Sequence, residues 1–374
     1  MIPEGAAGIS VGVVRRSAPV EPTPDPSRRV LLWLRGNLFN GPLNTLLTVV
    51  VVGLLVLIVP PFWRWAVTNA SISGVSRAAC APDGACWTFI RMRLPTFFVG
   101  HYPPDQRWRL GLVAALLVAF AYPALRENAH RRALWVVLLM TVFPVLASVL
   151  LVGGVFGLRF VDTNDWGGLM LDVIISFTTV VGSLPLGILL ALGRRSRLAI
   201  VRTLSIGFIE LWRGVPLLTV LFMSAVLVPL FLPEGVSVDR LVRAMVALIL
   251  FNAAYMAEVV RGALQGVPRG QDEAAYSLGL HWVQLQVTVV LPQALRIAVP
   301  GIVNTVVDLF KDVTLVTIVG LSDLLGTVNQ ALKDPAWLGF ATEGYVFSAA
   351  VFFVCCFVMS AYGRSIERRF GRHA

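Results

Sequence analysis

Long apolar stretches alternate with short polar segments along most of the chain. Eight of these stretches stand out, at residues 43–59, 110–125, 133–156, 169–192, 204–231, 241–260, 297–321 and 345–362. A helix of about 20 apolar residues crosses a hydrocarbon layer of about 30 Å. The pattern therefore predicts an all-α, polytopic integral membrane protein with about eight transmembrane helices. The second stretch is short, so a re-entrant or interfacial helix at 110–125 stays open as an alternative.

Residues 1–39 lack an apolar stretch. They contain prolines at four positions between 19 and 26, and paired arginines at Arg15/Arg16 and Arg28/Arg29. A signal peptide would need an apolar region of about 7–15 residues after its basic start. We therefore expect residues 1–39 to form a solvated tail that precedes the first transmembrane helix.

Arginine-rich turns predict the orientation in the membrane. Arginines cluster at 126–132, at 193–203 and in the last segment, 364–374, whereas the connections between these clusters hold few basic residues. Short basic loops favour the cytoplasmic side of a membrane. We therefore expect both termini in the cytoplasm, with 1–39 as an N-terminal tail and 364–374 as a basic C-terminal tail.

The loop at residues 60–109 departs from this pattern. It would lie outside the membrane, yet it contains six arginines. It also contains Cys80 and Cys86, on either side of a proline-glycine turn. In an oxidising compartment these two cysteines could close a small disulfide. Two free thiols remain an equal alternative, because spacing alone specifies no bridge.

The composition agrees with a lipid environment. Hydrophobic residues make up 57% of the chain and charged residues only 14%, and the mean hydropathy is +0.78. This apolar surface exceeds what soluble domains can bury. The formal net charge of +10 would suggest nucleic acid in a soluble protein. In a membrane protein it reflects basic cytoplasmic loops, so lipid is an expected partner and nucleic acid is not.

Several kinds of chemistry are absent from the sequence. The only two lysines, Lys311 and Lys333, are each followed by aspartate, so the chain has no phosphate-binding loop of the G-x-x-x-x-G-K-[ST] type. The four histidines are scattered, and no cysteine-histidine group has zinc spacing. We therefore predict no catalytic residues, no metal site and no cofactor bound by this chain.

The segment 261–296 is too polar to span a membrane and too patterned for a simple turn. Asp272 and Glu273 place negative charge where a short helix would begin, as the helix dipole favours. Ala274 and Ala275 follow with little side-chain bulk, and Gly279 suits a left-handed residue that ends the helix. The segment predicts a short exposed docking helix. An amphipathic connector on the membrane surface is the alternative.

Three motifs carry a family resemblance. The run from Glu273-Ala274-Ala275 through Gly279 to residues 289–292 (V-V-L-P) resembles the E-A-A-x3-G-x9-I-x-L-P signature of permease subunits of binding-protein-dependent ABC importers. Residues 208–218 (F-I-E-L-W-R-G-V-P-L-L) resemble a motif of the polar amino acid branch of this family. Residues 310–315 (F-K-D-V-T-L) resemble the K-D-[TS]-S-L motif of that branch, although valine and threonine replace the usual pair.

The resemblance implies a domain organisation. It covers roughly residues 166–365 and indicates a five-helix type I ABC importer core at 161–363, with a cytoplasmic coupling loop at 262–296. Residues 40–160 would supply additional N-terminal transmembrane helices, with the external loop 60–109. These extra spans and the C-x5-C-W loop look like the longer permeases of general L-amino acid uptake systems.

The resemblance also implies function and partners. The chain would be the membrane-spanning permease subunit of an ATP-driven amino acid importer in a bacterial inner membrane. Glu273, Ala274, Ala275 and Gly279 would couple it to a separate ATP-binding cassette subunit, expected in two copies, which binds the ATP and Mg²⁺. A second permease subunit or a second copy of this chain would complete the path. An external amino acid-binding protein would deliver the substrate.

Charged residues within the predicted spans are candidates for the substrate path, because ionisable groups are costly inside a membrane. Glu210 and Arg213 lie three residues apart on one helix face, as do Asp308 and Lys311. Asp312 follows Lys311, and the two carboxylates beside one lysine could meet the ammonium group of an amino acid. The alternative is that each set only neutralises its own charge near the membrane surface.

A secondary, ion-coupled amino acid transporter is the alternative function. Such transporters are typically built from repeated halves with broken helices. The first three predicted spans do not resemble the last five, so the sequence shows no internal repeat. An intramembrane enzyme is disfavoured because no histidine lies in any predicted span.

Overall fold

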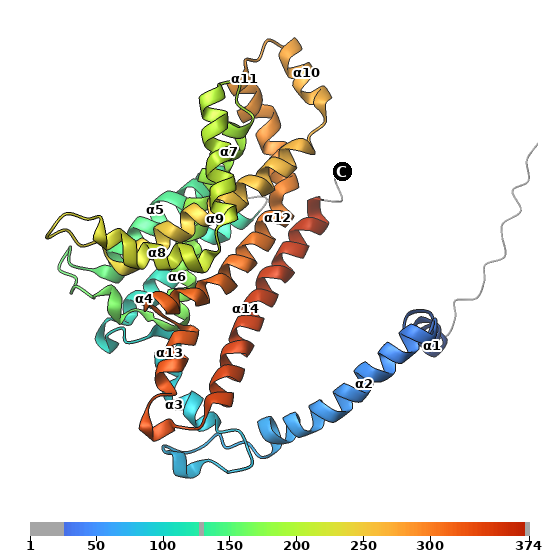
Figure 1. The fold of residues 1–374 in the computed structure, drawn as a ribbon, viewed down its shortest axis with the longest axis vertical. Coiled ribbons are helices and arrows are strands. Elements are labelled where there is room, and N and C mark those ends of the chain that lie inside the picture. The colour runs from blue at the N-terminus through green and yellow to red at the C-terminus, as the bar shows by residue number, and fades with distance from the viewer. Residues whose placement is uncertain (1–25, 127–130, 371–374) are drawn as a thin grey trace, which may run out of the picture. The chain divides into compact units, whose positions relative to one another are not determined.

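The computed structural model describes residues 26–126 and 131–370 (Figure 1). The chain divides into two compact units, Met1–Asn69 and Ala70–Ala374.

The first unit consists of two helices in the part of it that the structure describes. α1 (Pro26–Asn37) begins with proline, which suits the first position of a helix because its missing N–H would be unpaired there anyway. α2 (Pro42–Trp63) continues into a short π-helix, Arg64–Thr68. None of the residues of α2 is buried, so its apolar side chains are free to face lipid. Part of the predicted solvated tail is thus helical, and residues 1–25 lie outside the described residues.

The second unit holds the remaining helices. They are α3 (Trp87–Val99), α4 (Trp108–Leu125), α5 (Arg132–Val152), α6 (Gly168–Arg194), α7 (Ala199–Gly214), α8 (Leu217–Leu230), α9 (Arg240–Gln265), α10 (Arg269–Ser277), α11 (Trp282–Gln284), α12 (Leu291–Asp312), α13 (Leu324–Ala331) and α14 (Ala341–Phe370). A two-residue strand, β1 (Ser322–Asp323), pairs with the start of α6. α10 and α11 lie at one end of the unit, whereas α3 and α13 lie at the opposite end (Figure 1).

α9 is the central helix of the second unit. It packs against α6, α7, α8 and α12, and its buried face is rich in alanine. Gly187 of α6 allows the closest approach, because a Cβ atom there would lie 2.6 Å from Cβ of Met256 and 3.0 Å from the carbonyl oxygen of Ala253. Small side chains at such crossings let membrane helices pack closely.

Six helices of the described residues are long and apolar enough to cross a membrane. They are Pro42–Thr68, Pro104–Leu125, Arg132–Val152, Gly168–Arg194, Arg240–Gln265 and Ala341–Arg368. Each overlaps one of the predicted stretches, which confirms an all-helical, multi-span membrane protein. The predicted number of eight is not confirmed, since the described residues give six spans, or seven if a bent pair forms one more.

The predicted span at 204–231 is broken. Its two parts, α7 and α8, are bent by 99°. The break follows Gly214 and lies at Val215 and Pro216, where the proline has no N–H to continue the helical hydrogen bonds. The predicted span at 204–231 is therefore a bent pair of helices, which forms either one broken span or a re-entrant loop.

The predicted span at 297–321 also differs. α12 ends at Asp312, and a 3-10 segment (Val313–Val319) follows before the chain reaches β1. α12 is not one of the six helices that are long and apolar enough to cross a membrane. Its own polar side chains explain this difference, because Arg296, Asn304 and Asp308 interrupt the apolar run.

Candidate functional site

The segment that follows α9 forms a short projecting helix. The chain leaves α9 at Gly266, and α10 occupies nine residues, Arg269–Ser277. Gly279 has a φ of +78°, and the N–H of Leu280 donates to the carbonyl oxygen of Ala275. This pattern ends a helix with a left-handed residue, as the sequence predicts. No heavy atom lies within 4 Å of where a Cβ of Gly279 would be, so its backbone conformation, and not crowding, requires glycine.

The two alanines of α10, Ala274 and Ala275, face different ways. Glu273 and Ala274 are exposed, whereas Ala275 is buried and packs in a core cluster with Leu285 and Val290. Ala275 is therefore covered by this chain's own residues, whereas Ala274 leaves the helix surface open. The packing of Ala275 holds α10 against the segment Leu285–Val290.

Two large side chains at the C-terminal end of α10 are exposed. Tyr276 is 45% exposed and Leu278 is 82% exposed. Sequence reasoning did not single out either residue. Their position in the sequence could have predicted their exposure, because a side chain between a short polar helix and its terminal glycine is too far from an apolar stretch to be buried in lipid or in a core.

A polar cavity brings together three of the predicted path residues. Its volume is about 470 Å³. It is lined by residues of α8, α9 and α12, namely Leu217, Phe251, Asn252, Tyr255, Thr305, Asp308, Leu309, Lys311 and Asp312. The ammonium group of Lys311 lies 2.8 Å from Oδ1 of Asp308. Both side chains remain more than half exposed, so the pair does not withdraw them from the cavity.

Glu210 and Arg213 lie outside this cavity and do not pair with each other. Arg213 lies 3.7 Å from Glu258, and Glu210 lies 3.4 Å from Arg194. The alternative that Glu210 and Arg213 neutralise each other directly is therefore wrong. Spacing along α7 puts the two side chains on one face, but carboxylate and guanidinium groups of neighbouring helices offer them other partners.

Glu258 is the centre of this ionic network. Its carboxylate accepts hydrogen bonds from Arg194 at 2.8 Å and from the Nε and Nη2 of Arg261 at 2.8–3.1 Å. Its side chain is only 18% exposed. The network joins the ends of α6, α7 and α9. We name Arg194, Glu210, Arg213, Glu258 and Arg261 the Glu258 network.

The Glu258 network lies next to the cavity. The guanidinium carbon of Arg213 is 5.8 Å from the ring centre of Tyr255, a cation-π contact. Tyr255 also lines the cavity. In the other direction, α9 runs from Glu258 to Gly266 and then into α10. The network thus sits between the cavity and the projecting helix.

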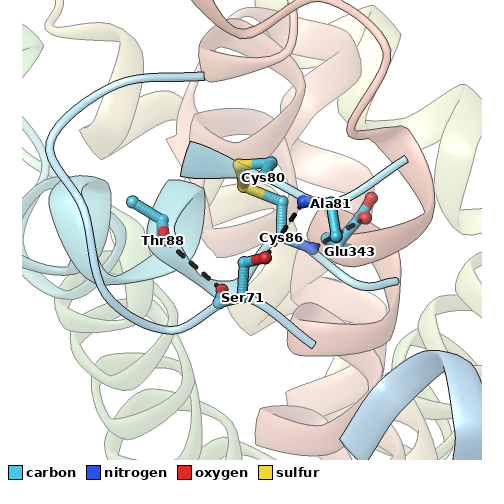
Figure 2. Close-up of a disulfide and its surroundings, with 6 residues drawn as sticks. All are labelled: Ser71, Cys80, Ala81, Cys86, Thr88 and Glu343. Atoms are coloured by element: carbon cyan, nitrogen blue, oxygen red, sulfur yellow. Dashed lines mark hydrogen bonds between the residues drawn. A yellow bond between two sulfur atoms is a disulfide. The ribbon is translucent and has the colours of Figure 1, made fainter. Parts of the chain in front are cut away.

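At the opposite end of the unit, Cys80 and Cys86 form a disulfide (Figure 2). Cys86 is fully buried, and its backbone N–H donates to Oε1 of Glu343 at 3.1 Å. Glu343 lies in the first turn of α14, where the helix dipole favours a carboxylate.

The carboxylates of two aspartates bind the start of α13. The side chain of Asp323 accepts the N–H groups of Leu325 and Gly326 and so caps the helix. Burial raises the pKa of Asp323 above its usual range, and the hydrogen bond from Thr317 and those from the backbone oppose this shift. Asp172 of α6 is fully buried and accepts the N–H of Leu324 at 3.1 Å. Asp172 therefore ties α6 to α13.

No group of three or more histidine, cysteine, aspartate or glutamate side chains suited to a metal ion occurs within residues 26–126 and 131–370.

Comparisons with known proteins agree with these features. Residues 183–372 match the family described as "Binding-protein-dependent transport system inner membrane component". The chain is 49% identical, over 354 residues, to the "Inner membrane amino-acid ABC transporter permease protein YhdY" of Escherichia coli (strain K12), and the match covers 95% of this chain and 96% of that protein.

A second relative and a solved structure are also similar. The chain is 39% identical over 429 residues to the "Glutamate/glutamine/aspartate/asparagine transport system permease protein BztC" of Rhodobacter capsulatus, with 96% of this chain and 98% of that protein covered. A structure titled "Crystal structure of an amino acid ABC transporter with histidines" is 27% identical, with a TM-score of 0.49. That match covers 54% of this chain and 92% of the other.

Proposed function

The chain belongs to the family of binding-protein-dependent transport system inner membrane components, and on that premise we propose that it forms the translocation path of an ATP-driven amino acid importer. The observation that carries the proposal is α10, a nine-residue helix that projects from the end of α9 and ends at a left-handed glycine. Two relatives that match almost the whole chain are named as amino acid permeases, which supports amino acids as the substrate class. An ion-coupled secondary transporter finds no support in these comparisons.

α10 is the proposed contact with the ATP-binding cassette subunit. Its exposed side chains include those of Glu273, Ala274 and Tyr276, and the exposed Leu278 follows at the end of the helix. A small side chain at 274 lets a partner approach the helix, and the side chains of Tyr276 and Leu278 offer surface to bury. The core contacts of Ala275 would make the helix a rigid lever. ATP and Mg²⁺ would be bound by the partner, expected in two copies.

The basic turn between α6 and α7 supports a cytoplasmic position for α10. Arg195 of that turn lines a common pocket with Arg269 and Asp272 of α10. The turn and the helix are therefore at the same end of the unit. Since basic loops favour the cytoplasm, we propose that this end lies inside and that α3 and α13 lie at the outer end. We also propose that both termini are cytoplasmic, from the arginine clusters at 126–132, 193–203 and 364–374.

The cavity around Lys311 is the proposed substrate path. An amino acid carries an ammonium and a carboxylate group, and the cavity offers both complements. The carboxylates of Asp308 and Asp312 suit the ammonium group, and Lys311 suits the carboxylate. A second permease subunit, or a second copy of this chain, would close the remaining side of the path. An external amino acid-binding protein would deliver the substrate to the outer end.

The Glu258 network is the proposed connection between the substrate path and α10. Glu258 lies two turns before the end of α9, and Tyr255 of the cavity lies one turn further back. Movement of α10 would therefore reach the cavity through the same helix that carries the network. Because the network also holds α6 and α7, the three helix ends would move together when the ATP-binding subunits close.

The variant Gly279→Asp tests the coupling role. Aspartate tolerates the left-handed conformation better than most L-residues, so the main perturbation is the new carboxylate, which adds a charge at the end of the proposed docking helix. We expect substrate-dependent uptake to be lost while the protein remains in the membrane. Normal uptake by this variant, measured in cells with equal amounts of membrane-inserted protein, would contradict the proposal.

A matched pair of alanine variants isolates the backbone effect. At both Gly270 and Gly279, no heavy atom lies within 4 Å of where a Cβ would be, but only Gly279 has a positive φ. Gly279→Ala is therefore expected to impair uptake more than Gly270→Ala does. Equal effects of the two substitutions would argue that any change in α10 is disruptive, whatever its backbone conformation.

A further inference from the structure

A segment outside the family match is built into the outer end of the second unit. Residues 70–100 precede the matched region, 183–372, by more than eighty positions in the chain. The disulfide between Cys80 and Cys86 closes this segment on itself (Figure 2). Two backbone hydrogen bonds also join Ser71 to the residues around Cys86. The N–H of Ser71 donates to the carbonyl oxygen of Ala85 at 2.8 Å, and the carbonyl oxygen of Ser71 accepts the N–H of Thr88 at 3.1 Å.

The closed segment is joined to the start of α14 by one buried polar contact. The N–H of Cys86 donates to Oε1 of Glu343 at 3.1 Å, across 257 positions of sequence. Cys86 is fully buried, and Glu343 is 5% exposed. A buried carboxylate must be hydrogen-bonded to be tolerated. The contact therefore fixes the position of the disulfide relative to α14.

An aromatic seam adds to this attachment. The ring of Phe89 in α3 lies 5.6 Å from that of Trp337 and 6.2 Å from that of Phe340. The guanidinium of Arg77 lies over the ring of Phe340 at 5.8 Å. These partners occupy the connection between α13 and α14. The contacts hold that connection against α3 by packing as well as by charge.

The far end of α3 meets the start of α6 and β1 at three glycines. A Cβ on Gly100 would lie 2.5 Å from the backbone of Gly167, and a Cβ on Gly167 would lie 2.8 Å from the carbonyl oxygen of Ser322. A Cβ on Gly168 would lie 2.3 Å from the carbonyl oxygen of Phe97. The three chain segments therefore pack at backbone distance, which places the end of α3 in direct contact with the start of α6 and, through it, with β1.

We propose that residues 70–100, closed by the Cys80–Cys86 disulfide, are a brace that positions α13 and the outer end of α14 for transport. The connection to the path is short. Asp312 of the cavity is followed by the 3-10 segment Val313–Val319, and then by β1 and α13. A shift of α13 therefore acts on the helix that carries Lys311. The transport role of the brace rests on the proposed function, whereas the positioning of α13 does not.

Hydrogen exchange of the full chain in lipid nanodiscs tests the positioning. In Cys80→Ser/Cys86→Ser, the amides of α13 and of residues 335–347 are expected to exchange about tenfold faster, since the closed loop no longer limits local opening. The matched control is Cys355→Ser/Cys356→Ser, which also removes two sulfur atoms but breaks no bridge. Faster exchange confined to residues 70–88 would overturn the proposal.

Substitutions of Glu343 provide a second test that leaves the disulfide intact. Glu343→Gln keeps an oxygen that can accept the N–H of Cys86, whereas Glu343→Ala removes it. We expect exchange in α13 to rise about tenfold in the alanine variant and to stay within about twofold of the wild type in the glutamine variant. Equal exchange in both variants would overturn the role of this contact.

Uptake measurements separate the brace from the proposed function. With equal amounts of protein in the membrane, Glu343→Ala is expected to lower the maximal rate of amino acid uptake about tenfold, and Glu343→Gln to restore it. Wild-type uptake by both variants, despite faster exchange in α13, would overturn the transport role of the brace. A wild-type chain that supports no amino acid uptake would instead contradict the proposed function, and the exchange data would still decide the positioning.

Discussion

The substitution Glu258→Gln tests the link between the path and α10. It replaces the carboxylate that accepts hydrogen bonds from Arg194 and Arg261 and lies 3.7 Å from Arg213. The amide keeps the size and one acceptor oxygen of the side chain but removes its charge. Three guanidinium groups then face one another with only Glu210 to balance them, at 3.4 Å from Arg194.

The magnitude follows from the burial of the network. An exposed ion pair contributes about 0–1 kcal/mol, and removal of one partner of a fully buried pair costs about 3–5 kcal/mol. Glu258 is 18% exposed while its arginine partners are 28–39% exposed, so it lies between these limits. We expect a cost of about 2 kcal/mol, which corresponds to about a 30-fold change in an equilibrium.

The assay is the ratio of amino acid transported to ATP hydrolysed in proteoliposomes that contain the assembled transporter. We expect this ratio to fall about 30-fold in Glu258→Gln, because ATP hydrolysis continues while the helix ends no longer move together. Glu210→Gln is the matched control. Its side chain is 58% exposed and has one contact at 3.4 Å, so its effect should stay below about fivefold. A normal ratio in Glu258→Gln, or equal effects of both substitutions, would contradict the coupling role of Glu258.

Two further predictions concern the path and the helix packing. Lys311→Met should raise the KM for zwitterionic amino acids about tenfold at unchanged protein level, because it removes a cationic group that lines the cavity; unchanged uptake kinetics for acidic, neutral and basic amino acids would exclude this role. Gly187→Ala should destabilise the protein by about 1–3 kcal/mol, because the new Cβ would lie 2.6 Å from Cβ of Met256. Gly207→Ala has no heavy atom within 4 Å of its Cβ and is the control; equal thermal unfolding midpoints of the two variants in detergent would contradict the packing argument.

Local patterns in the sequence predict the helices well where one physical demand dominates. The apolar runs of α5 and α6 must match the thickness of a bilayer, and the structure places helices there. Gly279 ends α10 in the left-handed conformation that its position after a short polar helix predicts. Helix length and helix ends depend on residues that are close in the sequence, so one sequence is enough to predict them.

Features that depend on several helices were not predictable in the same way. Glu258 lies within an apolar run, and its partners Arg194 and Arg213 come from two other helices. Spacing therefore suggested a pair on one helix, Glu210 with Arg213, which the structure does not contain. The apolar run at 204–231 does not reveal the break at Pro216, because hydropathy averages over a single proline. The contact from Cys86 to Glu343 crosses most of the chain and has no local signal.

We propose that this chain forms an amino acid path that a separate ATP-binding subunit drives. The most direct measurement is accumulation of a labelled amino acid in proteoliposomes, with the chain alone, with its ATP-binding subunit, and with an external binding protein added. We predict accumulation only when all three components and ATP are present, and no ATP hydrolysis by the purified chain alone. Accumulation by the chain alone, driven by an ion gradient and without ATP, would contradict the claim.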